Sequence, residues 1–243
     1  MKTPSSKARL LSLAFLIGAL QFLGTASAVA GNISVFPLRA TLESPKNSDV
    51  LTVTNVDNKP LLLQPTVFVW SQIDGKEVLE PTRDILVAPP LVEIGPGESQ
   101  VIRLVSRKEA DPQKELTYRV ILQEIPKPNQ KGQSAVTMAL RVSLPIFVLP
   151  KVPTQAKIDA QLQGNSTGLT VVLKNSGNAH LQFKTTTLRD ANGIVGSNNT
   201  MIYILQGQAA QIKFPLPTRP LAGNLRIEAQ TDAGDFSQDV RPQ

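Results

Sequence analysis

Short runs of β-forming residues recur along the chain from residue 33 onward, and turn signals separate them. No stretch has a sustained helical period, so the sequence predicts an all-β protein. Asp74-Gly75 stands between two runs and predicts a tight hairpin, because both central positions of that turn need a positive φ. The runs of the first half predict an immunoglobulin-like sandwich of about seven short strands; they cover 33–35, 51–55, 61–70, 78–79, 86–91, 99–105, 117–123 and 135–148.

A polar segment flanked by prolines, at 149–154, marks the expected boundary between two domains. The residues after it repeat the same pattern over about 90 residues, a size typical of a small domain. We therefore expect two immunoglobulin-like β-sandwich domains, at 31–150 and 154–243; the strands expected in the second are 169–173, 180–188, 201–205, 210–214 and 225–231.

The N-terminus has the three parts of a secretory signal peptide. Basic residues precede an apolar run at 10–23, and small residues at 26–30 offer cleavage sites after Ala28 and after Ala30. The apolar run is shorter than the ~20 residues that a membrane span needs. Residues 1–30 are therefore expected to be cleaved, leaving an exported protein without a membrane span.

Composition narrows the classes of function. The chain has no Cys, so an exported form must be stabilised by buried apolar surface and sheet hydrogen bonds rather than by disulfides. The formal charge is +6, of which three basic residues in 1–30 contribute half, leaving +3 for the mature chain. No basic stripe with interleaved aromatic residues is present, so nucleic acid is not expected as a partner.

The segment 135–148 alternates apolar residues with smaller or polar ones, and it contains Pro145. Proline cannot donate to a sheet ladder, so the segment is predicted to be an edge strand. Proteins normally suppress a long edge with an apolar face, unless that edge exists to pair with another chain. We therefore interpret it as a binding strand, and the same edge would also allow two copies of the free protein to associate.

Residues that carry enzyme chemistry are mostly absent. His180 is the only histidine, and we expect it at a strand end or on the surface rather than in a Ser-His-Asp triad or a metal site. There is no glycine-rich phosphate-binding loop and no His-Glu-x-x-His motif. The sequence predicts a protein that is not an enzyme and has no cofactor or metal, although the fold could still bring two carboxylates together.

Arg39 lies within 33–42, a first strand that should otherwise bury alternate residues. Such an arginine either reaches the surface or is held in a cleft to receive an anion. Spacing alone favours the surface, since lone charges on strands are mostly exposed.

Several segments of 32–150, in order and spacing, resemble the N-terminal domain of a PapD-like periplasmic pilus-assembly chaperone of the chaperone–usher system. In the second domain only Asn175-Ser176-Gly177-Asn178 does so, more weakly. The segments of the first domain are the Arg39 strand, Leu51-Thr52-Val53-Thr54-Asn55 with Asn58-Lys59-Pro60, Ala88-Pro89-Pro90-Leu91 with Ile94-Gly95-Pro96-Gly97, Arg119-Val120-Ile121-Leu122-Gln123-Glu124-Ile125-Pro126, and the edge strand that runs into Leu149-Pro150.

This resemblance implies two immunoglobulin-like sandwiches set at an angle, in a periplasmic chaperone that works without ATP. In this family the edge strand completes the unfinished sandwich of a pilus or fimbrial subunit, by donor-strand complementation, and the chaperone delivers the subunit to an outer-membrane usher. Matching the family's Ala-Leu step onto Ala139-Leu140 implies donor side chains on one face of the strand; they are Val136, Met138, Leu140, Val142 and Leu144.

The family also holds the subunit's C-terminal carboxylate with two basic residues. Arg39 matches the first, and a guanidinium can bind a carboxylate through two parallel hydrogen bonds. The family's second residue, a lysine, falls at Pro145, as in the branch of the family whose edge strand ends in a Leu-Pro-Ile-Phe-like sequence. Arg103, Arg119 or Arg141 could replace it, and we expect Arg103.

Two other classes of function compete with the chaperone. A structural pilus or surface subunit is also an exported β-sandwich, but it has an incomplete fold and a free N-terminal donor segment. Here the first domain has a full strand count, and the N-terminus is expected to run directly into the strand that carries Arg39. A periplasmic hydrolase or sugar-binding enzyme on a sandwich has no supporting group of residues in this sequence.

Overall fold

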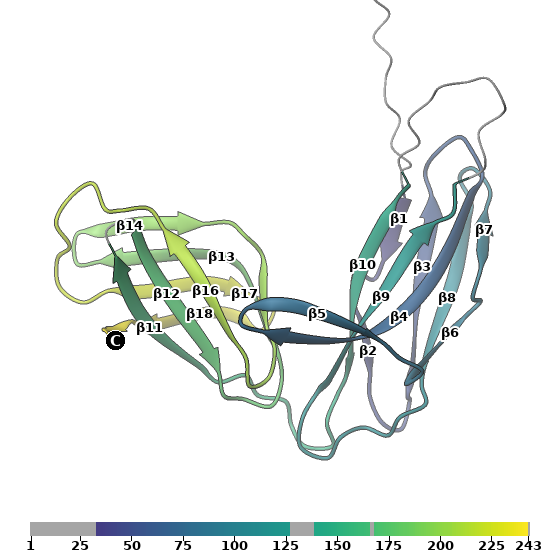
Figure 1. Cartoon of the computed structure of the whole chain (residues 1–243), viewed down its shortest axis with the longest axis horizontal. Coiled ribbons are helices and arrows are strands. Elements are labelled where there is room, and N and C mark those ends of the chain that lie inside the picture. Colours follow the sequence, from purple (N-terminus) through teal and green to yellow (C-terminus); the bar gives the residue numbers. More distant parts are fainter. Residues whose placement is uncertain (1–32, 127–138, 166–167, 243) are drawn as a thin grey trace, which may run out of the picture. The chain divides into compact units, whose positions relative to one another are not determined.

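The computed structural model describes residues 33–126, 139–165 and 168–242, which contain nineteen strands and no helix (Figure 1). The all-β fold class is therefore confirmed. The expected signal peptide at 1–30 lies outside the described residues. No described segment forms a helix that is long and apolar enough to cross a membrane.

The first sandwich consists of two sheets that enclose one apolar core. One sheet has the order β1-β3-β8-β6; the other has the order β2-β10-β9-β4-β5, with β7 also paired to β4. The strands are β1 Ile33–Phe36, β2 Ala40–Leu42, β3 Ser48–Asn55, β4 Leu61–Ile73, β5 Lys76–Pro81, β6 Ile85–Ala88, β7 Val92–Ile94, β8 Ser99–Ser106, β9 Leu116–Glu124 and β10 Arg141–Val148.

Alternation along the strands fills this core. In β3 and β8, Leu51, Val53, Ile102 and Leu104 are fully buried, while the residues between them face outward. The hairpin predicted at Asp74-Gly75 joins β4 to β5, with φ values of 51° and 74° at the two central residues. The short strands β2 and β7 raise the strand count above the expected seven or so.

The second sandwich repeats this plan. Its sheets have the orders β16-β12-β11-β19 and β14-β13-β17-β18, with β15 also paired to β13. Phe183, Leu188 and Ile227 lie at the centre of its core. The strands are β11 Ile158–Asn165, β12 Gly168–Asn175, β13 Leu181–Asp190, β14 Gly193–Asn198, β15 Ile202–Ile204, β16 Ala209–Phe214, β17 Arg226–Thr231, β18 Gly234–Asp239 and β19 Arg241–Pro242.

Strands that sequence reasoning missed are mainly edge strands. β14 and β18 lie at the two ends of their sheet and bury few side chains, so their sequences lack apolar alternation. Residues 149–157 join β10 to β11 and contain the expected domain boundary, which stays a prediction. Both sandwiches belong to one compact unit of the fold.

A buried asparagine fixes one interior strand of each sandwich in the same way. Asn55 ends β3 and Asn175 ends β12, and both are 0% exposed. Each amide nitrogen donates to the carbonyl four residues later and to the carbonyl of an isoleucine in another strand; the acceptors are Lys59 and Ile94 at 2.8 and 3.0 Å, and Ala179 and Ile204 at 2.8 and 3.1 Å.

Candidate binding edge and carboxylate site

The edge of β10 is open along part of its length. β10 pairs with β9 from Arg141 to Val148, but β2 covers its other side only from Ile146 to Val148. Within the described residues, 141–145 therefore has one unpaired edge, and Pro145 lies at the end of it. The expected edge strand is confirmed over 141–145 and is wrong over 146–148, where a parallel strand occupies the edge.

The expected donor side chains fall into three groups. Val136 and Met138 lie outside the described residues. Leu140 is partly buried, and its backbone N–H donates to Glu124 Oε2 at 2.8 Å. Val142 packs partly buried against the core of the first sandwich.

Leu144 is only 5% exposed and belongs to that same core, so in this structure its side chain is already buried within the protein. Successive side chains of a strand alternate between its two faces, so Val142 and Leu144 share the face of β10 that covers the protein's own core. Leu140 and Val142, by contrast, are only partly buried.

Two exposed apolar residues stand next to Arg39. Phe36, the last residue of β1, is 77% exposed, and Leu38, two residues before β2, is 69% exposed. Large apolar side chains that are this exposed and this close together in the sequence indicate an interaction surface. Sequence reasoning missed both residues, although Phe36-Pro37-Leu38 directly precedes Arg39 in the sequence.

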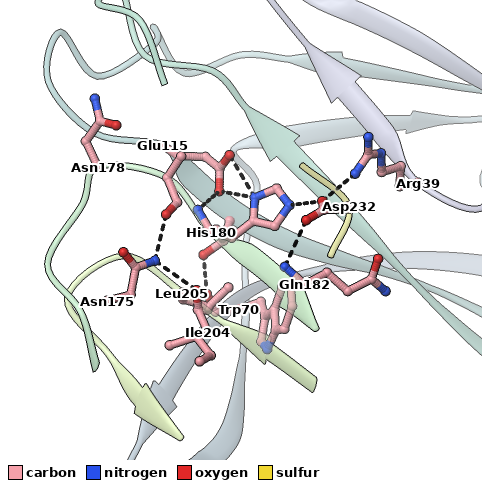
Figure 2. A network of polar contacts seen from close by, with 12 residues as sticks. Arg39, Trp70, Glu115, Asn175, Asn178, His180, Gln182, Ile204, Leu205 and Asp232 are labelled. Carbon is pink, nitrogen blue, oxygen red and sulfur yellow. Dashed lines mark hydrogen bonds and ion pairs between the residues drawn. The ribbon is translucent and has the colours of Figure 1, made fainter. Parts of the chain in front are cut away.

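Arg39 belongs to a chain of four charged or titratable side chains (Figure 2). Its Nη1 lies 2.7 Å from Asp232 Oδ2, and His180 Nε2 lies 3.2 Å from the same oxygen. On its other side, His180 Nδ1 lies 2.8 and 3.0 Å from the two carboxylate oxygens of Glu115. Arg39 and Glu115 come from the first sandwich, His180 and Asp232 from the second, and each stands immediately outside a strand end or in a turn.

The imidazole of His180 is enclosed by apolar and acidic groups. The Phe147 ring stacks on it, with ring centroids 3.6 Å apart and an angle of 6° between the planes. Trp70, Phe147 and Leu205 form a buried cluster beside it, with Tyr203 packed against them. The His180 side chain is therefore only 10% exposed.

Hydrogen bonds and burial act in opposite directions on the pKa values here. Burial lowers the pKa of His180, but its hydrogen bonds to Asp232 and Glu115 outweigh this and raise the pKa above its ordinary value. Burial raises the pKa of Asp232, but the hydrogen bond to His180, the Gln182 N–H and the charge of Arg39 lower that pKa to about 2. Asp232 is thus charged at neutral pH.

Arg119 forms a second cationic position near Tyr203. It lies directly opposite Pro145 across the β9–β10 ladder. Its guanidinium lies 3.8 Å from the centroid of the Trp70 ring, and its Nη2 lies 2.6 Å from Glu77 Oε1. Both Arg119 and Arg39 act electrostatically on the Tyr203 hydroxyl.

Arg103 and Arg141 lie elsewhere. Arg103 is exposed on the outer face of β8, next to Val50 and Ala88 of the neighbouring strands. Arg141 is exposed at the start of β10.

The family is decided by the sequence of the first sandwich. Residues 32–153 match the family model for pili and flagellar-assembly chaperones, PapD N-terminal domain. The chain belongs to this family. Its members are assembly chaperones rather than enzymes, as the sequence predicted.

Solved structures with low sequence identity share the chaperone's fold. The CsuC–CsuE chaperone–tip adhesion subunit complex of Acinetobacter baumannii is 18% identical over 87% of this chain and 99% of the matching chain, with a TM-score of 0.67. The SafA pilin–SafB chaperone complex of Salmonella enterica is 15% identical over 88% and 98%, with a TM-score of 0.63. The Escherichia coli chaperone DraB is 20% identical over 87% and 97%, with a TM-score of 0.59. No curated protein sequence matches the chain.

His180 occupies the first of the two positions expected for it, a strand end. It stands one residue before β13, and it is buried rather than on the surface. Both of its ring nitrogens bond carboxylates, so neither is left to activate a hydroxyl as in a triad. Its partners are 65 and 52 residues away in the sequence, and no local pattern indicates them.

Proposed function

We propose that the chaperone caps pilus or fimbrial subunits by lending the N-terminal part of the β10 edge as a missing strand. The observation that supports this most directly is the unpaired edge at 141–145. Exposed Phe36, at the end of β1, and exposed Leu38, just before the neighbouring strand β2, add apolar surface. An open edge offers backbone N–H and C=O groups to a partner strand whatever its sequence. Subunits of differing sequence could therefore share one chaperone.

Side chains on one face of the edge would supply the remaining affinity. Val142 and Leu144 lie on the face of β10 that covers the chaperone's own core, and Leu140, Met138 and Val136 precede them in the sequence at the same two-residue spacing. Extended into a subunit, this face would fill the subunit's core in the same register. Each apolar side chain that becomes fully buried contributes about 1.5–3 kcal/mol.

Arg39 is proposed to hold the subunit's C-terminal carboxylate. Within the described residues, its guanidinium bonds only Asp232, through Nη1, and the side chain is 47% exposed. The other guanidinium donors can therefore bind an incoming carboxylate, and arginine suits that task because it can form two parallel hydrogen bonds.

Arg119 is proposed as the second cation, in place of the lysine that the family has at the position of Pro145. It faces Pro145 across the ladder, and its partner Glu77 is 51% exposed and so can be displaced. The expectation for Arg103 stays a prediction, but its place on the outer face of β8 favours Arg119.

The family and the solved complexes support the wider role. Structures with the same fold include complexes of a chaperone with a tip adhesion subunit and with a pilin. We propose that this chaperone likewise receives its subunits in the periplasm, after removal of 1–30, and passes them to an outer-membrane usher.

Affinity purification of the tagged mature chaperone from periplasmic extract tests the proposal, with bound proteins identified by mass spectrometry. We expect a small β-rich subunit at equal stoichiometry, lost with Leu140→Glu and with Arg39→Ala. Circular dichroism and thermal unfolding confirm that each variant is folded.

Two further variants separate the candidates for the second cation. Arg119→Met keeps apolar contact with Trp70 and should weaken capture, whereas Arg103→Ala should leave it unchanged. Capture that survives Leu140→Glu but not Arg39→Ala would show that the strand assignment is wrong. If the unmodified chaperone retains no subunit, the proposed function fails.

A further inference from the structure

Arg39 already holds a carboxylate that is built into the chaperone. Asp232 lies in the turn between β17 and β18, and its Oδ2 lies 2.7 Å from Arg39 Nη1. The Asp232 side chain is 12% exposed, and its Oδ1 accepts the Gln182 N–H at 2.9 Å. A bound chain's carboxylate must therefore share Arg39 with a fixed like charge.

The protonation state of His180 determines whether Arg39 alone balances the negative charge of Asp232. Both ring nitrogens lie within 3.2 Å of carboxylate oxygens, Nδ1 at Glu115 and Nε2 at Asp232. A neutral imidazole has one N–H and one acceptor nitrogen, so only the doubly protonated ring can donate to both carboxylates. In the neutral ring, one nitrogen lone pair would face a carboxylate oxygen.

We propose that His180 and Asp232 regulate Arg39: protonated His180 shares the charge of Asp232 and leaves Arg39 able to bind an incoming carboxylate, and loss of the proton weakens that binding. This inference rests on the proposed role of Arg39 as the carboxylate anchor. His180 and Asp232 would act through Arg39, and neither needs to touch the subunit.

The charge balance gives the direction of the effect. The groups that face His180 are Glu115 and Asp232, with the uncharged rings of Phe147 and Tyr203 on its other sides. With His180 protonated, two carboxylates are balanced by His180 and Arg39. Without that proton the group is net negative, and an incoming carboxylate adds a second uncompensated charge.

Linkage makes the effect reciprocal. If protonation of His180 strengthens carboxylate binding, carboxylate binding must raise the pKa of His180 by the same free energy. The chain has a single histidine, so an untagged or Strep-tagged mature protein gives one imidazole signal by NMR, and the assignment is unambiguous.

The probe is an acetylated nonapeptide of alternating valine and serine with a free C-terminal carboxylate, and the same peptide with a C-terminal amide is its control. NMR first gives the His180 midpoint; calorimetry then measures affinity one unit below and one unit above it. We expect the carboxylate peptide to bind about tenfold more weakly above the midpoint, the effect of one added like charge at a half-exposed site. The amide peptide should bind equally at both pH values.

Variants identify the groups responsible. His180→Gln should abolish the pH dependence, and Asp232→Asn should strengthen binding of the carboxylate peptide at both pH values, because it removes the like charge that shares Arg39. Asp239→Asn, which removes an exposed carboxylate from a surface ion pair, should behave like the unmodified protein. Circular dichroism and unfolding curves at both pH values confirm that the variants are folded.

The outcomes separate this inference from the proposed function. Carboxylate-dependent binding that stays constant while His180 titrates overturns the inference and leaves Arg39 as the anchor. Binding of the carboxylate peptide that still depends on pH in His180→Gln also overturns the inference. Equal binding of the carboxylate and amide peptides at every pH overturns the anchor role, and the regulation with it.

Discussion

Replacing Asn55 by alanine should destabilise the first sandwich by about 3 kcal/mol. The Asn55 side chain is fully buried and makes three hydrogen bonds, donating to Lys59 O and Ile94 O and accepting from Asp57 N. Each such bond contributes about 1 kcal/mol net, and its loss leaves a buried backbone group without a partner. Asn175→Ala should cost about 4 kcal/mol, because its side chain makes a fourth bond, from Lys157 N.

Urea unfolding of the mature protein measures both effects, with circular dichroism reporting the whole chain and fluorescence reporting the single tryptophan, Trp70. Two probes are needed because a protein with two domains need not unfold in one step. Asn58→Ala is the matched control, since Asn58 is an exposed asparagine in the turn that follows Asn55, and we expect a change within about 0.5 kcal/mol.

A cost below about 1 kcal/mol for Asn55→Ala would contradict the reasoning, because it would mean that water or a rearranged loop satisfies the freed carbonyls. The stability losses of Asn55→Ala and Asn175→Ala can also be compared with each other. A large loss for one variant and none for the other would show that the shared geometry of the two sandwiches does not reflect a shared energetic role.

Three other predictions concern the second sandwich. Gly177→Ala should destabilise the protein by more than about 2 kcal/mol in the same urea assay, because the added Cβ would lie 2.6 Å from the Lys157 backbone nitrogen. The raised pKa of His180 contributes stability that is complete below its ordinary value of 6.5 and is lost as pH rises through the raised value; thermal unfolding across pH 6–10 should show this loss, and His180→Gln should remove it. The lowered pKa of Asp232 contributes stability that is present above its ordinary value of 3.8 and is lost as pH falls toward about 2, and Asp232→Asn should lose less stability in acid than the unmodified protein.

The sequence predicted the fold class and many of the strands because those features depend on neighbouring residues. Alternation identified β3, β4, β8 and β9, and the hairpin turn followed from Asp74-Gly75. Edge strands such as β14 and β18 bury too few side chains to leave that signal. Resemblance in motif order led to the family, which the match over 32–153 establishes.

The arrangement around Arg39 came only from the tertiary structure. Arg39 and Asp232 are 193 residues apart, and the sequence of neither predicts the other. Likewise, only the register of β9 against β10 places Arg119 opposite Pro145, and only packing shows that Leu144 belongs to the protein's own core. Backbone preferences act over a few residues, so the sequence by itself determined strands, turns and an apolar face. Which charged groups meet depends on how two sandwiches bury their cores, and that is decided by contacts between distant parts of the chain.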